Sequence, residues 1–97
     1  MAWKPGTYYM YIMSSSSGAT YIGMTNNLMR RVQEHRDEGE DGYCGKWFID
    51  KLVYFETYSS PMEAITREKQ IKKWVRKKKL ALISESNPKW EDITHLL

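Results

Sequence analysis

The stretch Gly18–Arg36 constrains the fold of this chain more strongly than any other segment, because its pattern changes from strand to helix. A β-prone pair that begins with Tyr21 ends at Gly23, and a turn follows. The apolar positions after the turn are four residues apart, at Leu28 and Val32, which is the spacing of one helix face. The stretch therefore predicts a strand, a turn and a helix over about residues 27–36.

Two polar side chains share a face of that expected helix. Arg31 and His35 are four residues apart, so they lie on one face, beside the face that packs inward. Thr25 or Asn26 is expected to cap the helix, close to the end of the strand that carries Tyr21. A tyrosine, an arginine and a histidine gathered in this way suit a phosphodiester better than a hydrophobic core.

The rest of the chain predicts two further strands. An aromatic and apolar run at residues 8–13 and the segment Lys51–Thr57 are both β-prone and bounded by turn residues. A Ser/Gly loop of hairpin length follows the first run, which should therefore pair antiparallel with the strand at residues 20–23. This pairing places Tyr11 on the strand next to that of Tyr21.

Two later helices complete the expected fold. Ser60–Glu63 reads as a capping box with proline at the first helical position. The apolar stripe that follows is interrupted by Glu68, and it loses phase near residues 74–78, which predicts a break and a further helix to about Glu85. The chain is therefore expected to form one α+β domain over residues 1–97, with a three-stranded antiparallel sheet flanked by about three helices.

Charge and cysteine content narrow the class of protein. The net charge is +3, and basic residues are concentrated in Lys69–Lys79, whereas residues 37–41 are acidic. The basic run predicts contacts with nucleic-acid phosphates. Cys44 alone cannot form an internal disulfide, the start at residues 1–5 has no apolar signal core, and no segment looks able to span a membrane. A cytoplasmic protein without membrane contacts is expected.

Two other features are less informative. Cys44, His35 and His95 are too few and too scattered along the sequence to predict a zinc site. The four carboxylates of the acidic segment at residues 37–41 would repel a DNA backbone. This segment is therefore expected to lie away from the path of the DNA or to gate it.

Five short motifs occur in an order that resembles the GIY-YIG nuclease family. They are Tyr9-Met10-Tyr11, Tyr21-Ile22-Gly23, Asn27-Leu28-x-x-Arg31, Glu68 in a later helix and Asn87 after it. The chain is most similar to the small stand-alone bacterial members, which resemble the N-terminal nuclease domain of the bacterial excision-repair nuclease. The resemblance covers nearly the whole chain and implies a three-stranded antiparallel sheet flanked by helices, with metal-dependent hydrolysis of a DNA phosphodiester.

The resemblance also assigns an active site, made of Tyr11, Tyr21, Arg31, His35, Glu68 and Asn87. On this assignment Tyr11, with His35 as helper, positions or deprotonates the attacking water, and Tyr21 orients the phosphate. A phenol is a poor base at neutral pH, so Tyr11 needs Arg31 or the metal to lower its pKa. Arg31 binds the scissile phosphate, and Glu68 holds one Mg²⁺ ion, with Mn²⁺ as a possible substitute. DNA phosphates outside the active site are expected to contact Lys69, Lys72, Lys73, Arg76, Lys77 and Lys79.

The sequence departs from the family pattern at two places. Tyr9 and Met10 replace the glycine and isoleucine of the first motif, which leaves its tyrosine intact. Met24 stands where the excision-repair nuclease has a lysine, so no second cation is available at that position.

Plainer interpretations stay open for the same residues. Glu68 could pair with Lys72 one helical turn on, and Asn87 could cap the end of a helix. Tyr11 and Tyr21 could be ordinary strand residues.

The function predicted is an endonuclease that cuts branched, flapped or damaged DNA, rather than a fixed sequence, in repair or recombination. One alternative is a nucleic-acid-binding module of the same fold that does not cut. The other is a nuclease that stays latent until a protein partner supplies DNA affinity.

Overall fold

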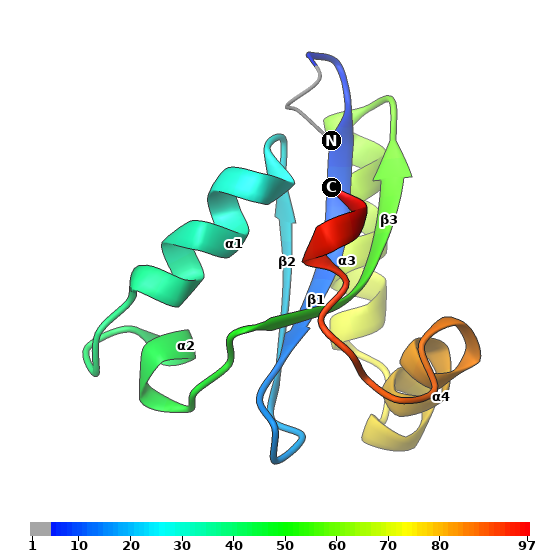
Figure 1. Ribbon diagram of the computed structural model, residues 1–97. Coiled ribbons are helices and arrows are strands. Elements are labelled where there is room, and N and C mark those ends of the chain that lie inside the picture. The colour runs from blue at the N-terminus through cyan, green and yellow to red at the C-terminus, as the bar shows by residue number, and fades with distance from the viewer. Residues whose placement is uncertain (1–4) are drawn as a thin grey trace.

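A three-stranded antiparallel sheet forms the centre of the computed structural model (Figure 1). Its strands are β1 (Tyr8–Ser14), β2 (Thr20–Thr25) and β3 (Lys51–Tyr58), in the order β2-β1-β3. The sheet predicted from the sequence is therefore confirmed. The structure describes residues 5–97, and the four residues before them, on which the expected absence of a leader depends, lie outside the described residues.

Helices cover both faces of the sheet (Figure 1). α1 (Leu28–Asp37) and the short α2 (Tyr43–Lys46) lie on one face, and the C-terminal turn η1 (Thr94–Leu96) returns to it. α3 (Pro61–Lys72) and α4 (Arg76–Ser86) lie on the other face. The α+β class is confirmed, with α2 as an additional helix in a segment that the sequence pattern left irregular.

β1 is buried on both faces because it is the central strand and helices cover each side. Tyr9, Tyr11 and Met13 belong to the hydrophobic core under α1, whereas Met10 and Ile12 belong to the core under α3 and α4. This alternation explains why the strand is aromatic or apolar at every position before Ser14. It also sends Tyr11 toward α1, the helix with the polar face.

The N-termini of α1 and α3 differ in detail from the sequence prediction. Asn27, and neither of the expected residues, caps α1, because its side chain accepts a hydrogen bond from the Arg30 amide at 3.2 Å. The Thr25 hydroxyl instead accepts from the Asn27 amide at 3.1 Å. α3 begins at Pro61 as expected, but Ser60 makes no side-chain capping bond, so the predicted capping box is not formed.

The predicted break between the last two helices is confirmed, since α3 ends and α4 begins within the basic run, with a short non-helical stretch between them. The inward stripe of α3 is narrower than expected, because Ala64 and Ile71 are fully buried while Met62 is 67% exposed. Val75, also expected on the stripe, lies beyond the end of α3 and is 71% exposed.

Every helix in the described part of the chain is short. The longest, α3, has 12 residues. Within residues 5–97, none has the length and apolar character needed to cross a membrane.

Candidate active site

Two buried polar side chains meet between β1 and α1. The Tyr11 hydroxyl lies 2.7 Å from Nε2 of His35, and the two residues are only 1% and 2% exposed. The His35 ring also packs against the Tyr21 ring, with centroids 4.7 Å apart, and the two tyrosine rings are 6.2 Å apart. Side chains from β1, β2 and α1 therefore form one group, Tyr11, Tyr21 and His35, which we call the tyrosine cluster.

The place of Tyr11 depends on a glycine on the next strand. Gly23 is the cross-strand partner of Tyr11, and the phenol ring lies directly over it. A Cβ atom at Gly23 would stand 2.6 Å from the Tyr11 hydroxyl oxygen, which is closer than such atoms approach. Gly23, the glycine of the second motif, therefore leaves room for the ring of Tyr11, the tyrosine of the first motif.

We expect Gly23→Ala to push the Tyr11 ring away from His35 and to destabilise the fold by about 1 to 3 kcal/mol, the usual cost of overpacking a core. Gly39→Ala is the matched control, because a Cβ there would meet nothing within 4 Å. Denaturant unfolding of both variants measures the difference. Equal stability of the two would contradict this account of Gly23.

Arg31 lies beside the tyrosine cluster. Burial lowers the pKa of its guanidinium, but interactions with Tyr11 and Tyr21 raise it by more. On its other side Arg31 pairs with Glu34 of the same helix at 3.3 Å. The structure therefore brings together four of the predicted residues, and it leaves Arg31 as the cation among them.

Arg31 alone does not activate Tyr11 as a base. Burial raises the pKa of Tyr11 well above its ordinary value, the neighbouring Tyr21 raises it further, and the opposing effect of Arg31 is smaller. The expectation that Arg31 would lower the pKa of Tyr11 far enough for it to act as a base is therefore wrong. Burial outweighs the charge because the Tyr11 phenol lies in the core, under α1.

A pocket opens at the β2 edge of the sheet, in front of the tyrosine cluster. Its volume is about 360 Å³, and Tyr21 is its link to the cluster. The residues that line it, which come from both faces of the sheet, are Thr20, Tyr21, Ile22, Tyr43, Lys72 and Lys79. We call this the edge pocket. It places one phenol of the cluster next to two lysines from α3 and α4.

Glu68 does not line the edge pocket, but it pairs with a lysine that does. Its Oε2 accepts a hydrogen bond from Nζ of Lys72 at 3.2 Å, so the plainer pairing within α3 is formed, and Lys72 also lines the pocket. The Glu68 side chain is 17% exposed. Mg²⁺ in nuclease-type sites is held by one or two carboxylates together with substrate phosphate oxygens and water. A single carboxylate paired with a lysine of the pocket fits such a shared ion.

A second group of potential metal ligands lies behind the tyrosine cluster. The ligand atoms of His35, Glu38 and Cys44 are all within 4.8 Å of one another. The prediction that Cys44 and His35 are too scattered is therefore wrong, because α2 folds back over the end of α1. Imidazole and thiolate donors favour Zn²⁺ over Mg²⁺. Burial, and then Glu38, raises the pKa of the Cys44 thiol to about 11, so that Cys44 is a thiol at neutral pH.

Asn87 lies apart from the tyrosine cluster. It ends α4 beside β3, at the opposite edge of the sheet from Tyr21. Its amide nitrogen donates to the carbonyls of Val53 and Glu91, and its oxygen accepts from the Glu91 amide at 3.1 Å. Asn87 stands at the C-cap position of α4, which is the alternative that the sequence left open, and its side-chain bonds fasten the C-terminal segment to β3.

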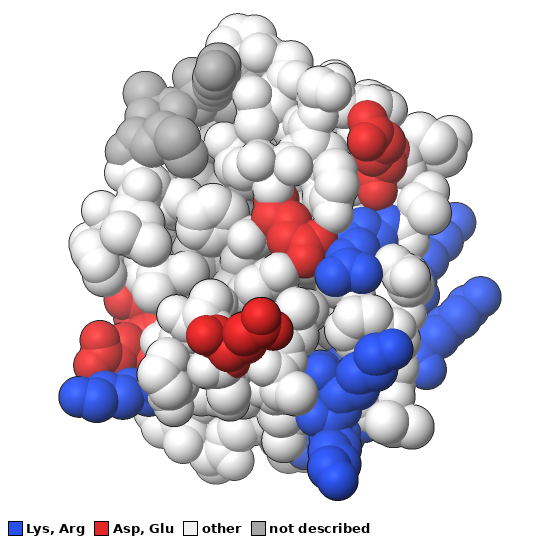
Figure 2. Space-filling model, turned by 90° about the vertical axis from the view of Figure 1, so that its right-hand side faces the viewer, with Lys and Arg blue, Asp and Glu red and all other residues white. Residues whose placement is uncertain are grey.

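The basic run forms one surface beside the edge pocket. Figure 2 shows Lys and Arg side chains gathered at the lower right of the molecule, over the end of α3 and over α4, with acidic side chains elsewhere on that face. Arg76 is partly structural, because it donates to the carbonyl of Gly18 in the β1–β2 loop at 2.7 Å. The other predicted phosphate contacts on this surface are exposed or half-buried lysines: Lys69, Lys72, Lys73, Lys77 and Lys79.

Residues 7–81 match the GIY-YIG catalytic domain. The chain belongs to the GIY-YIG family. It is 39% identical to a UPF0213 protein of Clostridium perfringens over 87% of this chain and 90% of that protein. It is 34% identical to a UPF0213 protein of Bacillus licheniformis over 84% of each chain.

Its fold also matches that of a GIY-YIG relative of known structure. The solution NMR structure of a UPF0213 protein from Bacillus halodurans has a TM-score of 0.56 and 28% sequence identity, and the match covers 93% of this chain and 96% of that one. The resemblance to small stand-alone GIY-YIG proteins is thereby confirmed. Nucleases of this family are generally metal-dependent, and the motif tyrosines of this chain lie in the matched region.

Two residues of the site had no sequence signal strong enough to find them. Tyr43 lines the edge pocket, and its ring centroid is 6.1 Å from that of Tyr21. Glu38 contacts His35 and belongs to the segment that the sequence marked only as acidic. The glycines around them were the one available signal, because they indicate a tightly folded segment.

Proposed function

We propose that this GIY-YIG protein is a Mg²⁺-dependent endonuclease that hydrolyses DNA phosphodiester bonds in the edge pocket. The observation that carries the proposal is the meeting of Tyr21 with Lys72 and Lys79 in one pocket, with Arg31 beside the same tyrosine. A concave site with several cations suits a phosphate, and a hydroxyl there suits a water molecule next to it.

Residues that line the edge pocket and residues next to it divide the chemistry among them. Arg31 binds the scissile phosphate and offsets the charge that grows on its oxygens in the transition state. Glu68 would hold Mg²⁺, which in such sites stabilises the leaving oxygen. Lys72 and Lys79 bind the phosphates next to the scissile one.

The two tyrosines differ in exposure, so their roles in this proposal differ from those that the resemblance gave them. Tyr11 is 1% exposed and its hydroxyl is bonded to His35, so it has no free access to a water molecule. Tyr21 is half-buried and lines the pocket. We therefore assign the orientation of the attacking water to Tyr21, and to Tyr11 and His35 the support of Tyr21 from behind.

The basic surface on α3 and α4 binds DNA without reading its sequence. For duplex DNA, affinity should fall with salt by a log–log slope of about 0.9 for each phosphate neutralised. Replacing Lys69, Lys73 and Lys77 with glutamine should lower the slope by about 0.9 for each lysine and weaken binding to all sequences alike. Binding titrations over a range of salt measure this, with Lys89→Gln, which lies outside the surface, as control. A loss confined to some sequences would indicate base readout there instead.

The substrate class that we propose is branched, flapped or damaged DNA, in a repair or recombination role. The test is to incubate the pure protein with linear, flapped, forked and four-way DNA in the presence of Mg²⁺, Mn²⁺ or EDTA. We expect metal-dependent cuts near the branch points. Tight binding without cuts would replace the proposal with a binding module. Cuts that need an added protein partner would replace it with a latent nuclease.

A further inference from the structure

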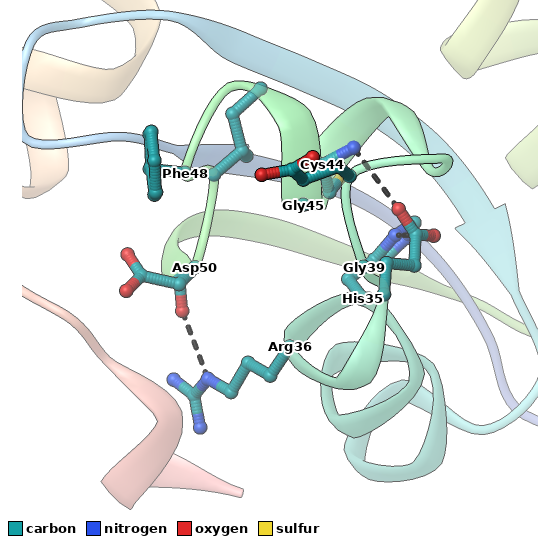
Figure 3. A pocket seen from close by; sticks show the side chains of 10 residues that line it. His35, Arg36, Gly39, Cys44, Gly45, Phe48 and Asp50 are labelled. Atoms are coloured by element: carbon teal, nitrogen blue, oxygen red, sulfur yellow. Dashed lines mark hydrogen bonds and ion pairs between the residues drawn. The ribbon is translucent and has the colours of Figure 1, made fainter.

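One carboxylate of the acidic segment is turned inward, toward the tyrosine cluster. Oε1 of Glu38 lies 3.1 Å from Nδ1 of His35, and its Oε2 accepts the backbone N–H of Cys44 at 3.0 Å. Figure 3 shows His35 and Cys44 around the same pocket, where the end of α1 faces α2. On the far side of the imidazole, Nε2 lies 2.7 Å from the Tyr11 hydroxyl. Each ring nitrogen of His35 therefore has one partner.

We propose that Glu38 is a positioning residue of the active site. It holds His35 as the Nδ1–H tautomer, so that Nε2 accepts a hydrogen bond from the Tyr11 hydroxyl. The expected effect of Glu38 on DNA cutting rests on the proposed function, whereas the expected tautomer of His35 is independent of it.

The bonding pattern follows from what each group can donate. An ionised carboxylate only accepts hydrogen bonds, so the bond to Glu38 needs a proton on Nδ1. With that proton on Nδ1, a neutral ring leaves Nε2 without a hydrogen, and Nε2 is the atom that lies 2.7 Å from the Tyr11 hydroxyl. Nε2 is then an acceptor, and the hydroxyl of Tyr11 must donate to it. Glu38 thus fixes the His35 ring and, through it, the two tyrosines that pack on that ring.

The chain around Glu38 is shaped to hold this contact. A Cβ atom at Gly42 would stand 2.5 Å from Oε2 and 2.8 Å from Cβ of Glu38, so only glycine leaves room for the carboxylate. Gly42 has φ of −90°, which alanine adopts freely, so the glycine supplies space and not an unusual conformation. The three other acidic residues of the segment, Asp37, Glu40 and Asp41, are exposed. The segment therefore does more than lie away from the DNA.

A metal ion is the rival occupant of the same atoms. If Zn²⁺ bound to Nδ1 of His35 together with Glu38 and Cys44, the ring proton would move to Nε2 and be donated to the Tyr11 oxygen. The two possibilities predict opposite tautomers. The tautomer is therefore the observable that separates them.

The experiment is long-range ¹H–¹⁵N NMR of the whole chain labelled at histidine, with exposed His95 as the reference signal. In EDTA we expect His35 to carry its proton on Nδ1. In Glu38→Gln the amide oxygen must face the Cys44 N–H, which cannot change, so the NH₂ group faces the ring. His35 should then switch to the Nε2–H tautomer. Glu40→Gln makes the same change at an exposed neighbour and should leave the ring as in the wild type.

Gly42→Ala tests the same contact without touching a polar group, and it serves if Glu38→Gln does not fold. We expect the alanine to displace Glu38 and to give a mixture of His35 tautomers. In single-turnover cutting, both variants should be about 10- to 100-fold slower than Glu40→Gln, the range for groups that orient functional histidines. DNA binding should be unchanged.

Two results would overturn the proposal. One is the Nε2–H tautomer in wild-type protein: seen in EDTA, it refutes the role of Glu38, and seen in the protein as purified but not in EDTA, it assigns the atoms to a metal site. The other is an unchanged His35 ring in both Glu38→Gln and Gly42→Ala. If the wild type cuts no DNA, the proposed function fails, and the tautomer switch alone decides the role of Glu38.

Discussion

Glu68→Gln should abolish DNA cutting while the fold and the binding of DNA stay nearly unchanged. Glu68 is the carboxylate that pairs with Lys72, a residue that lines the edge pocket. Glutamine keeps the size of the side chain but is a poor ligand for Mg²⁺, which prefers charged oxygen ligands. The pair with Lys72 is a partly exposed one on a single helix, so its loss should cost no more than about 0.5 kcal/mol.

The measurement is cutting at saturating protein with increasing Mg²⁺, alongside DNA binding in EDTA. Glu63→Gln is the matched control, because it makes the same change in the first turn of α3 at an exposed position. If Glu68→Gln retains metal-dependent cutting, Glu68 is not the metal ligand. The cluster of His35, Glu38 and Cys44 would then be the remaining candidate among the described residues.

Tyr21→Phe should slow cutting by about 10² to 10⁴, the usual range for groups that help to move or orient a proton in the transition state. The change removes one hydroxyl from the edge pocket and keeps the ring that packs on His35. Tyr11→Phe should slow cutting less, by about tenfold, because Tyr11 supports the site from behind. It should cost more stability, about 1 to 3 kcal/mol, since it leaves Nε2 of buried His35 without its hydrogen-bond partner.

Single-turnover cutting of one DNA substrate by both variants, with denaturant unfolding of the same samples, tests this pair of expectations. Each variant is the control for the other, because both remove only a phenol hydroxyl. A larger loss of rate in Tyr11→Phe than in Tyr21→Phe would assign the orientation of the attacking water to Tyr11.

Two features could be predicted because they depend on short-range patterns. One is the helix that carries Arg31 and His35, and the other is the position of this helix next to Tyr11 and Tyr21. A spacing of four residues fixes a helix face, and a hairpin-length loop fixes which strands pair. The depth of the tyrosines could not be predicted in the same way. It depends on β3 pairing with β1, which makes β1 central and buries Tyr11, and leaves β2 at the edge with Tyr21 open to the pocket.

The order of motifs along the chain did not indicate the contacts of residues that follow the ends of helices. Asn87 has the family position, but its amide is used by Val53 and Glu91 next to β3. Glu38 had no motif, and its inward direction depends on the fold of α2 back over α1, which no local pattern describes. Sequence spacing describes a face of one element, whereas these contacts join elements whose relative positions the core decides.

If the pocket beside the tyrosine cluster hydrolyses DNA, two adjacent arginines of α1 should differ in their effect on cutting. Arg31 lies beside Tyr11 and Tyr21, whereas Arg30 is exposed to solvent. The measurement is single-turnover cutting of one flapped DNA in Mg²⁺ by Arg31→Ala and Arg30→Ala at saturating protein. We predict a loss of about 10² to 10³ for Arg31→Ala, as for removal of a group that stabilises transition-state charge, and no change for Arg30→Ala. Equal rates for the two variants would contradict a catalytic site in this pocket.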